Sequence, residues 1–176
     1  MSAYRRAKVA WLRDGTRTVS GNVVTRRILV IAMDMRSIDN LLYTPAPDIF
    51  HDVFGHVPLH ADPAFARFLQ RFGQLAARAE REEHVVAMTR LFWFTVEFGL
   101  VREAGATRIY GSGLISSSGD AAHALGPDCD RRPFSLDAVI AQDFAIDRLQ
   151  DVLFVVERFE DLFVAMEEAG RRFGLA

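Results

Sequence analysis

Two histidines held five residues apart constrain this 176-residue chain more than any other feature. His51 and His56 lie in the segment PDIFHDVFGHVP, whose apolar side chains draw it into the interior, where imidazoles need polar partners or a metal. On an uninterrupted α-helix, residues five apart point about 140° away from each other. Both histidines would therefore face one metal only if the helix ended near Gly55, and Gly55 and Pro58 permit this. Spacing alone leaves a metal site and two ordinary core histidines as equal alternatives.

A glutamate among large apolar side chains supplies a third candidate ligand. Glu97 lies in the run FWFTVEFG, and burying an unpaired carboxylate costs several kcal/mol, so it must be neutralised, paired or bound to a metal. Arg90 or Arg102 would serve as the partner in an ordinary salt bridge. Together with His51 and His56, however, Glu97 would form a donor set of two imidazoles and one carboxylate. This donor set holds Fe(II) and leaves coordination positions open for dioxygen and a cosubstrate.

The rest of the pattern predicts a mainly α-helical fold with short β-strands, an α+β domain. Pro47 suits the first turn of a helix through His51, and Asp62 followed by Pro63 has the form of a helix start. Apolar residues three to four apart predict one long helix over residues 80–101. The glycine- and serine-rich stretch 108–119 predicts a loop or short strand with unusual backbone angles. Further expected elements are a hairpin or short strands within 1–27, a helix over 136–143, a strand over 153–156 and an amphipathic helix over 160–173.

Composition limits the classes of protein to which the chain can belong. Half of the residues are hydrophobic and the net charge is −2, which is typical of one globular domain over residues 1–176 and not of a nucleic-acid binder. The apolar run 28–33 is too short to span a membrane, and no secretory signal precedes it. The single cysteine, Cys129, lies in a polar stretch that predicts a surface loop, and it favours a cytoplasmic location. The helix over 160–173 presents either a homodimer surface or, alternatively, an internal core face, through Leu162, Phe163, Met166 and Phe173.

Several separate blocks resemble the aromatic amino acid hydroxylases, the pterin-dependent family that acts on phenylalanine, tyrosine and tryptophan. These blocks are YTP at 43–45, PDIFH at 47–51, FGHVPL at 54–59, WFTVEFGL at 93–100 and YGSGLISS at 110–117. The resemblance implies a non-heme Fe(II) monooxygenase that hydroxylates an aromatic amino acid or a close derivative with O2 and a tetrahydropterin. It also implies that His51, His56 and Glu97 are the catalytic iron ligands and that the hydroxyl of Ser116 supports one ligating histidine.

The same resemblance assigns roles around the iron. Arg36 aligns without a gap to the arginine that pairs with the substrate carboxylate, although a surface arginine is the alternative. Asp52 and Phe92 match positions near the pterin. The positions that line the amino-acid pocket are matched by Thr44, Pro47, Trp93, Phe98, Gly113 and Ser117.

The chain also departs from the family. Residues 1–35 are shorter than the corresponding part of a usual catalytic domain, and the loop that contacts the pterin is not found in them. Two alternatives therefore stay open, an iron-dependent oxygenase that uses another reductant and a non-catalytic metal-binding partner subunit. The pattern leaves the aromatic substrate and the ring position undecided. His84 and His123 are expected to be exposed, whereas His60 lies close enough to the site to reach a substrate.

Overall fold

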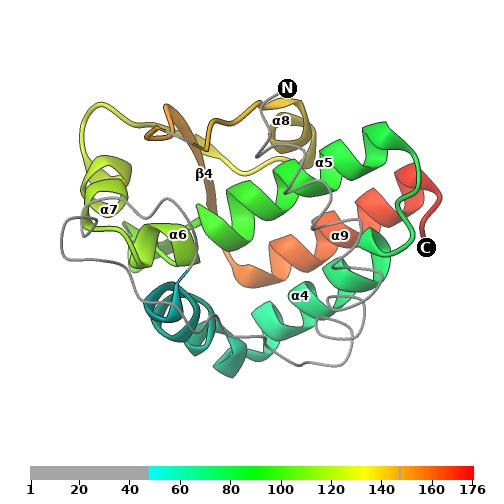
Figure 1. Cartoon of the computed structure of the whole chain (residues 1–176), viewed down its shortest axis with the longest axis horizontal. Coiled ribbons are helices and arrows are strands. Elements are labelled where there is room, and N and C mark those ends of the chain that lie inside the picture. The colour runs from blue at the N-terminus through cyan, green and yellow to red at the C-terminus, as the bar shows by residue number, and fades with distance from the viewer. Residues whose placement is uncertain (1–47, 147) are drawn as a thin grey trace.

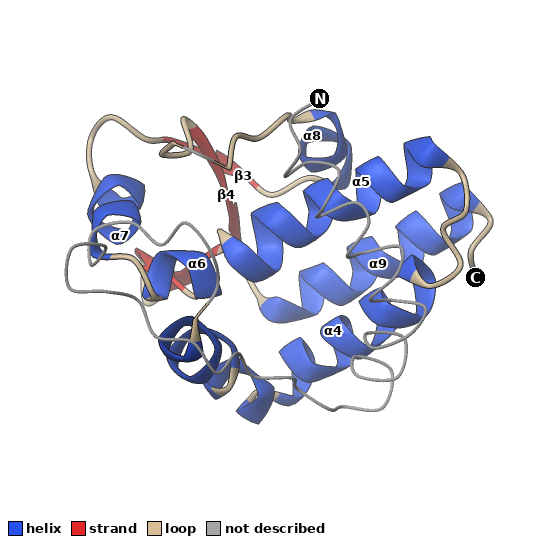
Figure 2. Ribbon diagram, viewed as in Figure 1, coloured by secondary structure: helices blue, strands red, loops and turns tan. Residues whose placement is uncertain are grey.

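The computed structural model describes residues 48–146 and 148–176, and within them the chain is mostly helical with one small sheet (Figures 1 and 2). The predicted α+β class is confirmed. The predictions for Arg36, Thr44, Pro47 and the hairpin in residues 1–27 lie outside the described residues. In chain order the elements are η3 (His51–His56), η4 (Pro58–Ala61), α4 (Pro63–Ala76), α5 (Glu82–Phe92), η5 (Trp93–Glu97), β1 (Leu100–Glu103), β2 (Ala106–Ile109), α6 (Ser112–Ile115), α7 (Ser118–Leu125), β3 (Asp130–Pro133), α8 (Leu136–Ala141), β4 (Val152–Val156) and α9 (Phe159–Phe173).

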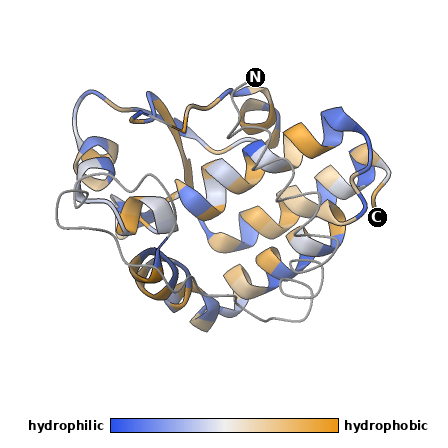
Figure 3. Ribbon diagram, viewed as in Figure 1, coloured by the Kyte–Doolittle hydropathy of each residue, from blue (hydrophilic) through white to orange (hydrophobic). Residues whose placement is uncertain are grey.

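Helix α4 begins as the sequence predicts. The Asp62 carboxylate accepts hydrogen bonds from the backbone N–H groups of Ala64 and Phe65, at 2.8 and 2.9 Å, and thereby satisfies two amides that have no partner within the helix. The apolar face of α4, which carries Phe65, Phe68, Leu69, Phe72 and Leu75, is buried and packs mainly against α9. Helices α4, α5 and α9 each carry both apolar and polar residues, as is typical of amphipathic helices that cover a core (Figure 3).

The sheet is mixed and has the strand order β2-β1-β4-β3. Strands β1 and β2 pair in antiparallel fashion, whereas β4 lies between β1 and β3 and runs parallel to both. Four of the five residues of β4 are buried, and this strand contacts both η5 and α9. The sheet therefore supports the segment that carries Glu97. The predicted strand over 153–156 and helices over 136–143 and 160–173 are confirmed within one to two residues.

Two predicted elements are wrong. The long helix over 80–101 is divided, because α5 ends at Phe92, η5 follows, and the chain is extended from Leu100 onward. The apolar spacing continues through Leu100, which is fully buried, but there it serves a strand. The stretch 108–119 does begin with the end of β2, but it then holds the short helix α6 and the start of α7, and none of its glycines has a positive φ. The glycine at 111 is needed because a β-carbon there would lie 2.4 Å from the backbone oxygen of Glu97.

One surface prediction is corrected, because Cys129 is buried, with 5% of its surface exposed, and belongs to the core cluster. For the apolar face of α9 the structure favours the internal core alternative, since Leu162 and Met166 are fully buried. A homodimer stays a prediction. No helix in the described residues is long and apolar enough to cross a membrane. The single-domain prediction for residues 1–176 stays a prediction.

Candidate metal centre

His51 and His56 are brought onto one side of the chain by a π-helical turn. In such a turn each N–H bonds to the carbonyl five residues earlier, and the bond from Val57 N to Asp52 O at 3.2 Å has this spacing. Residues five apart then lie nearly above one another, and Nε2 of His56 lies 3.1 Å from Nε2 of His51. We expected Gly55 to end a helix. Instead the helix widens, and Gly55 is needed because a β-carbon there would lie 2.9 Å from Ser112 Cβ.

Glu97 comes from a second π-helical turn. Segment η5 continues α5 with a wider turn, and Phe98 N bonds to Trp93 O at 2.8 Å. The Glu97 carboxylate is buried and faces both histidines, with Oε2 at 3.6 Å from His51 Nε2 and Oε1 at 3.8 Å from His56 Nε2. One ligand atom from each of the three residues lies within 4.8 Å of the others. Rare π-helical turns therefore supply all three donors, as at many functional sites.

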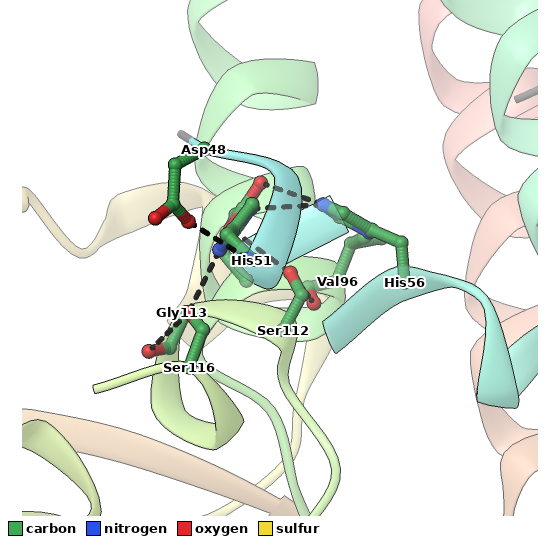
Figure 4. Close-up of polar contacts among 8 residues, drawn as sticks. Asp48, His51, His56, Val96, Ser112, Gly113 and Ser116 are labelled. Carbon is green, nitrogen blue, oxygen red and sulfur yellow. Dashed lines mark hydrogen bonds and ion pairs between the residues drawn. The ribbon is translucent and has the colours of Figure 1, made fainter. Parts of the chain in front are cut away.

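A short helix, α6, lies against both π-helical turns. Ser112 is its first residue and Ser116 its C-cap, and residues four apart around one helical turn lie on the same side. The Ser116 hydroxyl lies 2.8 Å from His51 Nδ1, and the Ser112 hydroxyl donates to Glu97 Oε2 at 3.0 Å. Figure 4 shows these serines beside His51, with Asp48, whose carboxylate accepts the backbone N–H of His51 at 2.9 Å. The sequence indicated a role for Ser116, but not for Ser112 or Asp48.

The donor set fits a divalent first-row metal such as Fe(II). Metal ligation needs neutral imidazoles, and burial is the main cause that lowers the pKa of His56 below its ordinary value, partly opposed by Glu97. The salt-bridge alternative for Glu97 is not what the structure shows, because Arg90 pairs with Asp143 and Arg102 with Glu157. Two imidazoles and one carboxylate converging from a rigid scaffold leave room for further ligands on the metal.

Residues 22–173 match the model of the biopterin-dependent aromatic amino acid hydroxylase family. The chain belongs to this family. It is 42% identical over 132 residues to phenylalanine-4-hydroxylase of Ralstonia nicotianae, which is 74% of this chain and 42% of that protein. It is 38% identical over 135 residues to tyrosine 3-monooxygenase of Drosophila melanogaster, which is 77% of this chain and 23% of that protein. The chain thus spans less than half the length of either relative.

Solved structures of the same family have the same fold. Chromobacterium violaceum phenylalanine hydroxylase with bound oxidised Fe(III) superposes with a TM-score of 0.82 at 33% identity, covering 88% of this chain and 56% of that one. The same enzyme with bound iron(III) and 7,8-dihydrobiopterin superposes with a TM-score of 0.79 at 32% identity, covering 88% of this chain and 57% of that one.

Three residues that were predicted to line the amino-acid pocket lie together next to Glu97. They are Trp93, Phe98 and Gly113. The rings of Trp93 and Phe98 stack with their centroids 4.6 Å apart, and a β-carbon on Gly113 would lie 3.1 Å from the Phe98 ring. The other face of Trp93 stacks on Phe144 at 4.5 Å, and its indole N–H donates to Gln150 at 3.2 Å. Phe144 and Gln150 could not be found from the sequence, because both are more than fifty residues away from Trp93 along the chain.

The other predicted site residues that the structure describes lie at the start of α7, in η3 and in α5. Ser117 is buried at the start of α7, where its hydroxyl donates to Asp120 at 2.5 Å and accepts from the Asp120 N–H at 3.3 Å. This bond opposes burial, which raises the pKa of the Asp120 carboxyl. Asp52 is buried in η3. Phe92 is partly buried, and its ring lies 5.4 Å from that of Phe72 on α4.

The three remaining histidines hold local structure. His60 donates from Nδ1 to the backbone oxygen of His56 at 2.8 Å. His84 was expected to be exposed, yet only 12% of its side chain is exposed. Its ring stacks on that of Phe173, with the ring centroids 4.8 Å apart. His123 was also expected to be exposed, but it is partly buried and its Nε2 bonds to the backbone oxygen of Gln150 at 2.8 Å.

An open hollow of about 450 Å³ lies between segments of the connection from α8 to β4, and no member of the metal cluster lines it. Its lining includes Phe144 and Gln150, the residues that contact Trp93. Trp93 thus lies between this hollow and Glu97, since both Trp93 and Glu97 belong to η5. The chemistry of the donor set, not the size of the hollow, identifies the candidate site.

Proposed function

We propose that this chain is the catalytic region of a monooxygenase that hydroxylates an aromatic amino acid, such as phenylalanine, tyrosine, tryptophan or a close derivative. The observation that carries the proposal is the cluster of His51, His56 and Glu97, of which His51 and Glu97 are buried and His56 is partly buried, and whose donor atoms lie within 4.8 Å of one another. Membership of the hydroxylase family supplies the reaction class. The relatives include both a phenylalanine and a tyrosine hydroxylase, so the proposal is made for the aromatic class.

In this proposal His51, His56 and Glu97 are the iron ligands and hold Fe(II) through Nε2 of both imidazoles and the carboxylate. When bound, Fe(II) and a tetrahydropterin would supply the electrons and the activation of O2 that ring hydroxylation needs. The three side chains are only 7 to 13% exposed, which would limit the access of bulk water to the reacting centre. Ser116 would hold the His51 ring so that Nε2 faces the metal, as is usual for partners of ligating histidines.

The substrate wall in this proposal is the stacked pair Trp93 and Phe98, with Gly113 against it. A flat aromatic ring fits such a wall, and the missing side chain of Gly113 keeps the Phe98 face clear. Ser117 is proposed to line the same pocket, where its bond to Asp120 fixes the hydroxyl. Arg36, Thr44 and Pro47 are proposed to complete the substrate site, and Asp52 and Phe92 to lie beside the pterin.

Product analysis tests the proposal. The protein is loaded with Fe(II) under anaerobic conditions, then mixed with tetrahydrobiopterin, O2 and each aromatic amino acid in turn. The expected result is a hydroxylated amino acid whose new oxygen comes from 18O2, in amounts that depend on pterin. The Glu97→Ala protein, treated in the same way, is the control and should give none.

Two other outcomes would point to the alternatives. Product formed equally well with another reductant and without pterin would favour an iron oxygenase that has exchanged its electron donor. Metal binding with no product from any aromatic amino acid would contradict the proposal and favour a non-catalytic metal-binding subunit.

A further inference from the structure

Ser112 is a buried hydroxyl beside the proposed metal centre. It is the first residue of α6 and has no exposed surface. Its Oγ lies 3.0 Å from Glu97 Oε2 and 3.1 Å from the backbone oxygen of Val96. A hydroxyl has one proton, so these two acceptors share it, and the carboxylate is the stronger acceptor because a hydrogen bond to a charged group is stronger.

Close packing holds Ser112 in this place. A β-carbon at Gly55, on η3, would lie 2.9 Å from Ser112 Cβ, and one at Gly111 would lie 2.4 Å from the backbone oxygen of Glu97. Both glycines therefore allow α6 to lie directly between the two π-helical turns. Ser112 is therefore enclosed, with no exposed surface, at the point where η3, η5 and α6 meet.

The position of this hydroxyl matters because a glutamate side chain is flexible. Glu97 must keep its carboxylate toward Nε2 of both histidines, at 3.6 and 3.8 Å, for three donors to meet one ion. The Ser112 hydroxyl, which donates to Oε2, restricts the Glu97 side chain before the metal binds. Less conformational entropy is therefore lost when the metal binds.

We propose that Ser112 is a positioning residue for Glu97 and that it sets the metal affinity of the site before any substrate binds. The inference rests on the proposed metal centre. Ser116 acts on His51 in the same way from one turn further along α6, so one short helix would position two of the three ligands. Ser112 does not contact the substrate in this proposal and acts only through Glu97.

Metal titration tests the inference without any assay of activity. Co(II), which has visible absorption, is titrated into the wild-type protein, Ser112→Ala and Ser118→Ala, and the melting temperature is measured with and without Co(II). Ser118 is the matched control because it lies on the same stretch but is exposed. We expect Ser112→Ala to weaken Co(II) binding on the order of 10- to 100-fold and to reduce the rise in melting temperature that Co(II) causes, while Ser118→Ala matches wild type.

A merely structural role gives a different result. In that case Ser112→Ala would melt earlier by the same amount with and without Co(II), its affinity would equal that of wild type, and the inference would be overturned. If Ser112→Ala does not fold, Ser112→Gly, which removes the hydroxyl together with the β-carbon that lies near Gly55, is titrated in its place.

A double-mutant cycle decides whether Ser112 acts through Glu97. Glu97→Gln should itself weaken Co(II) binding, and adding Ser112→Ala to it should then cost much less than it does in wild type. If the loss of Co(II) affinity in the double variant equals the product of the losses in the two single variants, the hydroxyl acts elsewhere and the inference is overturned. Failure of the wild-type protein to bind Co(II) would remove the metal centre as well, whereas tight binding by both wild type and Ser112→Ala would remove only the role of Ser112.

Discussion

The hydroxyl of Ser116 lies 2.8 Å from Nδ1 of His51, while Nε2 of the same ring faces Glu97 at 3.6 Å. The Ser116 hydroxyl also lies 3.4 Å from the backbone oxygen of Gly113, which can only accept a hydrogen bond. With its proton on this oxygen, the Ser116 hydroxyl accepts from His51 Nδ1–H. That arrangement corresponds to the tautomer in which the lone pair of Nε2 is free for a metal.

The first prediction follows from this pair. Ser116→Ala should weaken Fe(II) or Co(II) binding on the order of 10- to 100-fold, because the His51 ring loses the group that fixes its tautomer and orientation. Anaerobic titration with either metal measures the affinity, and circular dichroism checks that the fold is kept. An unchanged dissociation constant would show that the packing around His51 is enough to orient the ring.

The second prediction concerns the three proposed ligands. His51→Ala, His56→Ala and Glu97→Ala should each abolish hydroxylation and lower the iron content of the purified protein. Each should still fold, because the core formed by α4, α9 and the sheet does not include these side chains. Iron analysis by mass spectrometry and thermal melting measure the two properties separately. Full iron and activity in Glu97→Ala would remove the carboxylate from the ligand set.

The sequence predicted the fold where local signals agree with the packing. Asp62 and Pro63 start α4, and the apolar faces of α4 and α9 match the helical period, so propensity and burial point to the same structure. It failed at residues 80–101 and 108–119. There π-helical turns and glycines are set by contacts between η3, η5 and α6, and such contacts do not appear in local periodicity.

The candidate site shows the same division. His51, His56 and Glu97 were found because their chemistry is unusual for buried positions and because whole blocks match a family. Ser112 was missed although it lies four residues before Ser116, because that spacing has meaning only once a helix is known there. Gln150 could not be found from the sequence, since only the tertiary fold brings it to Trp93.

The third prediction concerns the buried hydroxyl of Tyr110, which has no hydrogen-bond partner among the described residues. Burial raises the pKa of this phenol, so it stays neutral and its O–H is unpaired. Tyr110→Phe should therefore raise the free energy of unfolding by about 1 kcal/mol, because an unsatisfied polar group is removed. Urea unfolding measures the change, and a clear loss of stability would mean that the hydroxyl is satisfied.

A contrasting variant tests the packing at the same ring. A β-carbon on Gly99 would lie 2.1 Å from Tyr110 Cζ and 2.3 Å from the backbone oxygen of Thr95, so Gly99→Ala should cost about 3 kcal/mol or more. A stable Gly99→Ala protein would show that the ring can move aside.

The fourth prediction concerns the support of the aromatic wall. Gln150 accepts the indole N–H of Trp93 and donates to the backbone oxygens of Ala145 and Arg148, at 2.5 and 3.0 Å. Gln150→Leu should lower the free energy of unfolding by about 1 to 3 kcal/mol, because several buried groups lose their partners, and should raise KM for the aromatic substrate. Gln142→Leu is the matched control, because its side-chain amide makes an exposed bond to Asp143. Equal effects of the two changes would contradict a special role for Gln150.

The last prediction is that Arg36 recognises the substrate carboxylate. Arg36 lies fifteen residues before His51, an offset that matches the family without a gap, and an aromatic wall alone cannot hold the charged end of an amino acid. A guanidinium forms two parallel hydrogen bonds to a carboxylate, whereas an ammonium is only a point charge. Arg36→Lys should therefore weaken substrate binding although the charge is kept, and Arg36→Ala should weaken it further.

Steady-state kinetics with an amino acid and its matching amine separate this role from that of a surface arginine. Wild type should strongly prefer the amino acid, and the preference should fall in Arg36→Lys and disappear in Arg36→Ala, because the amine has no carboxylate for Arg36 to bind. A solvated arginine predicts near-normal kinetics for both variants. If Arg36→Ala kept the preference for the acid, another group would bind the carboxylate. If wild type showed no preference, the natural substrate would lack a free carboxylate, and the proposed substrate class would have to change with it.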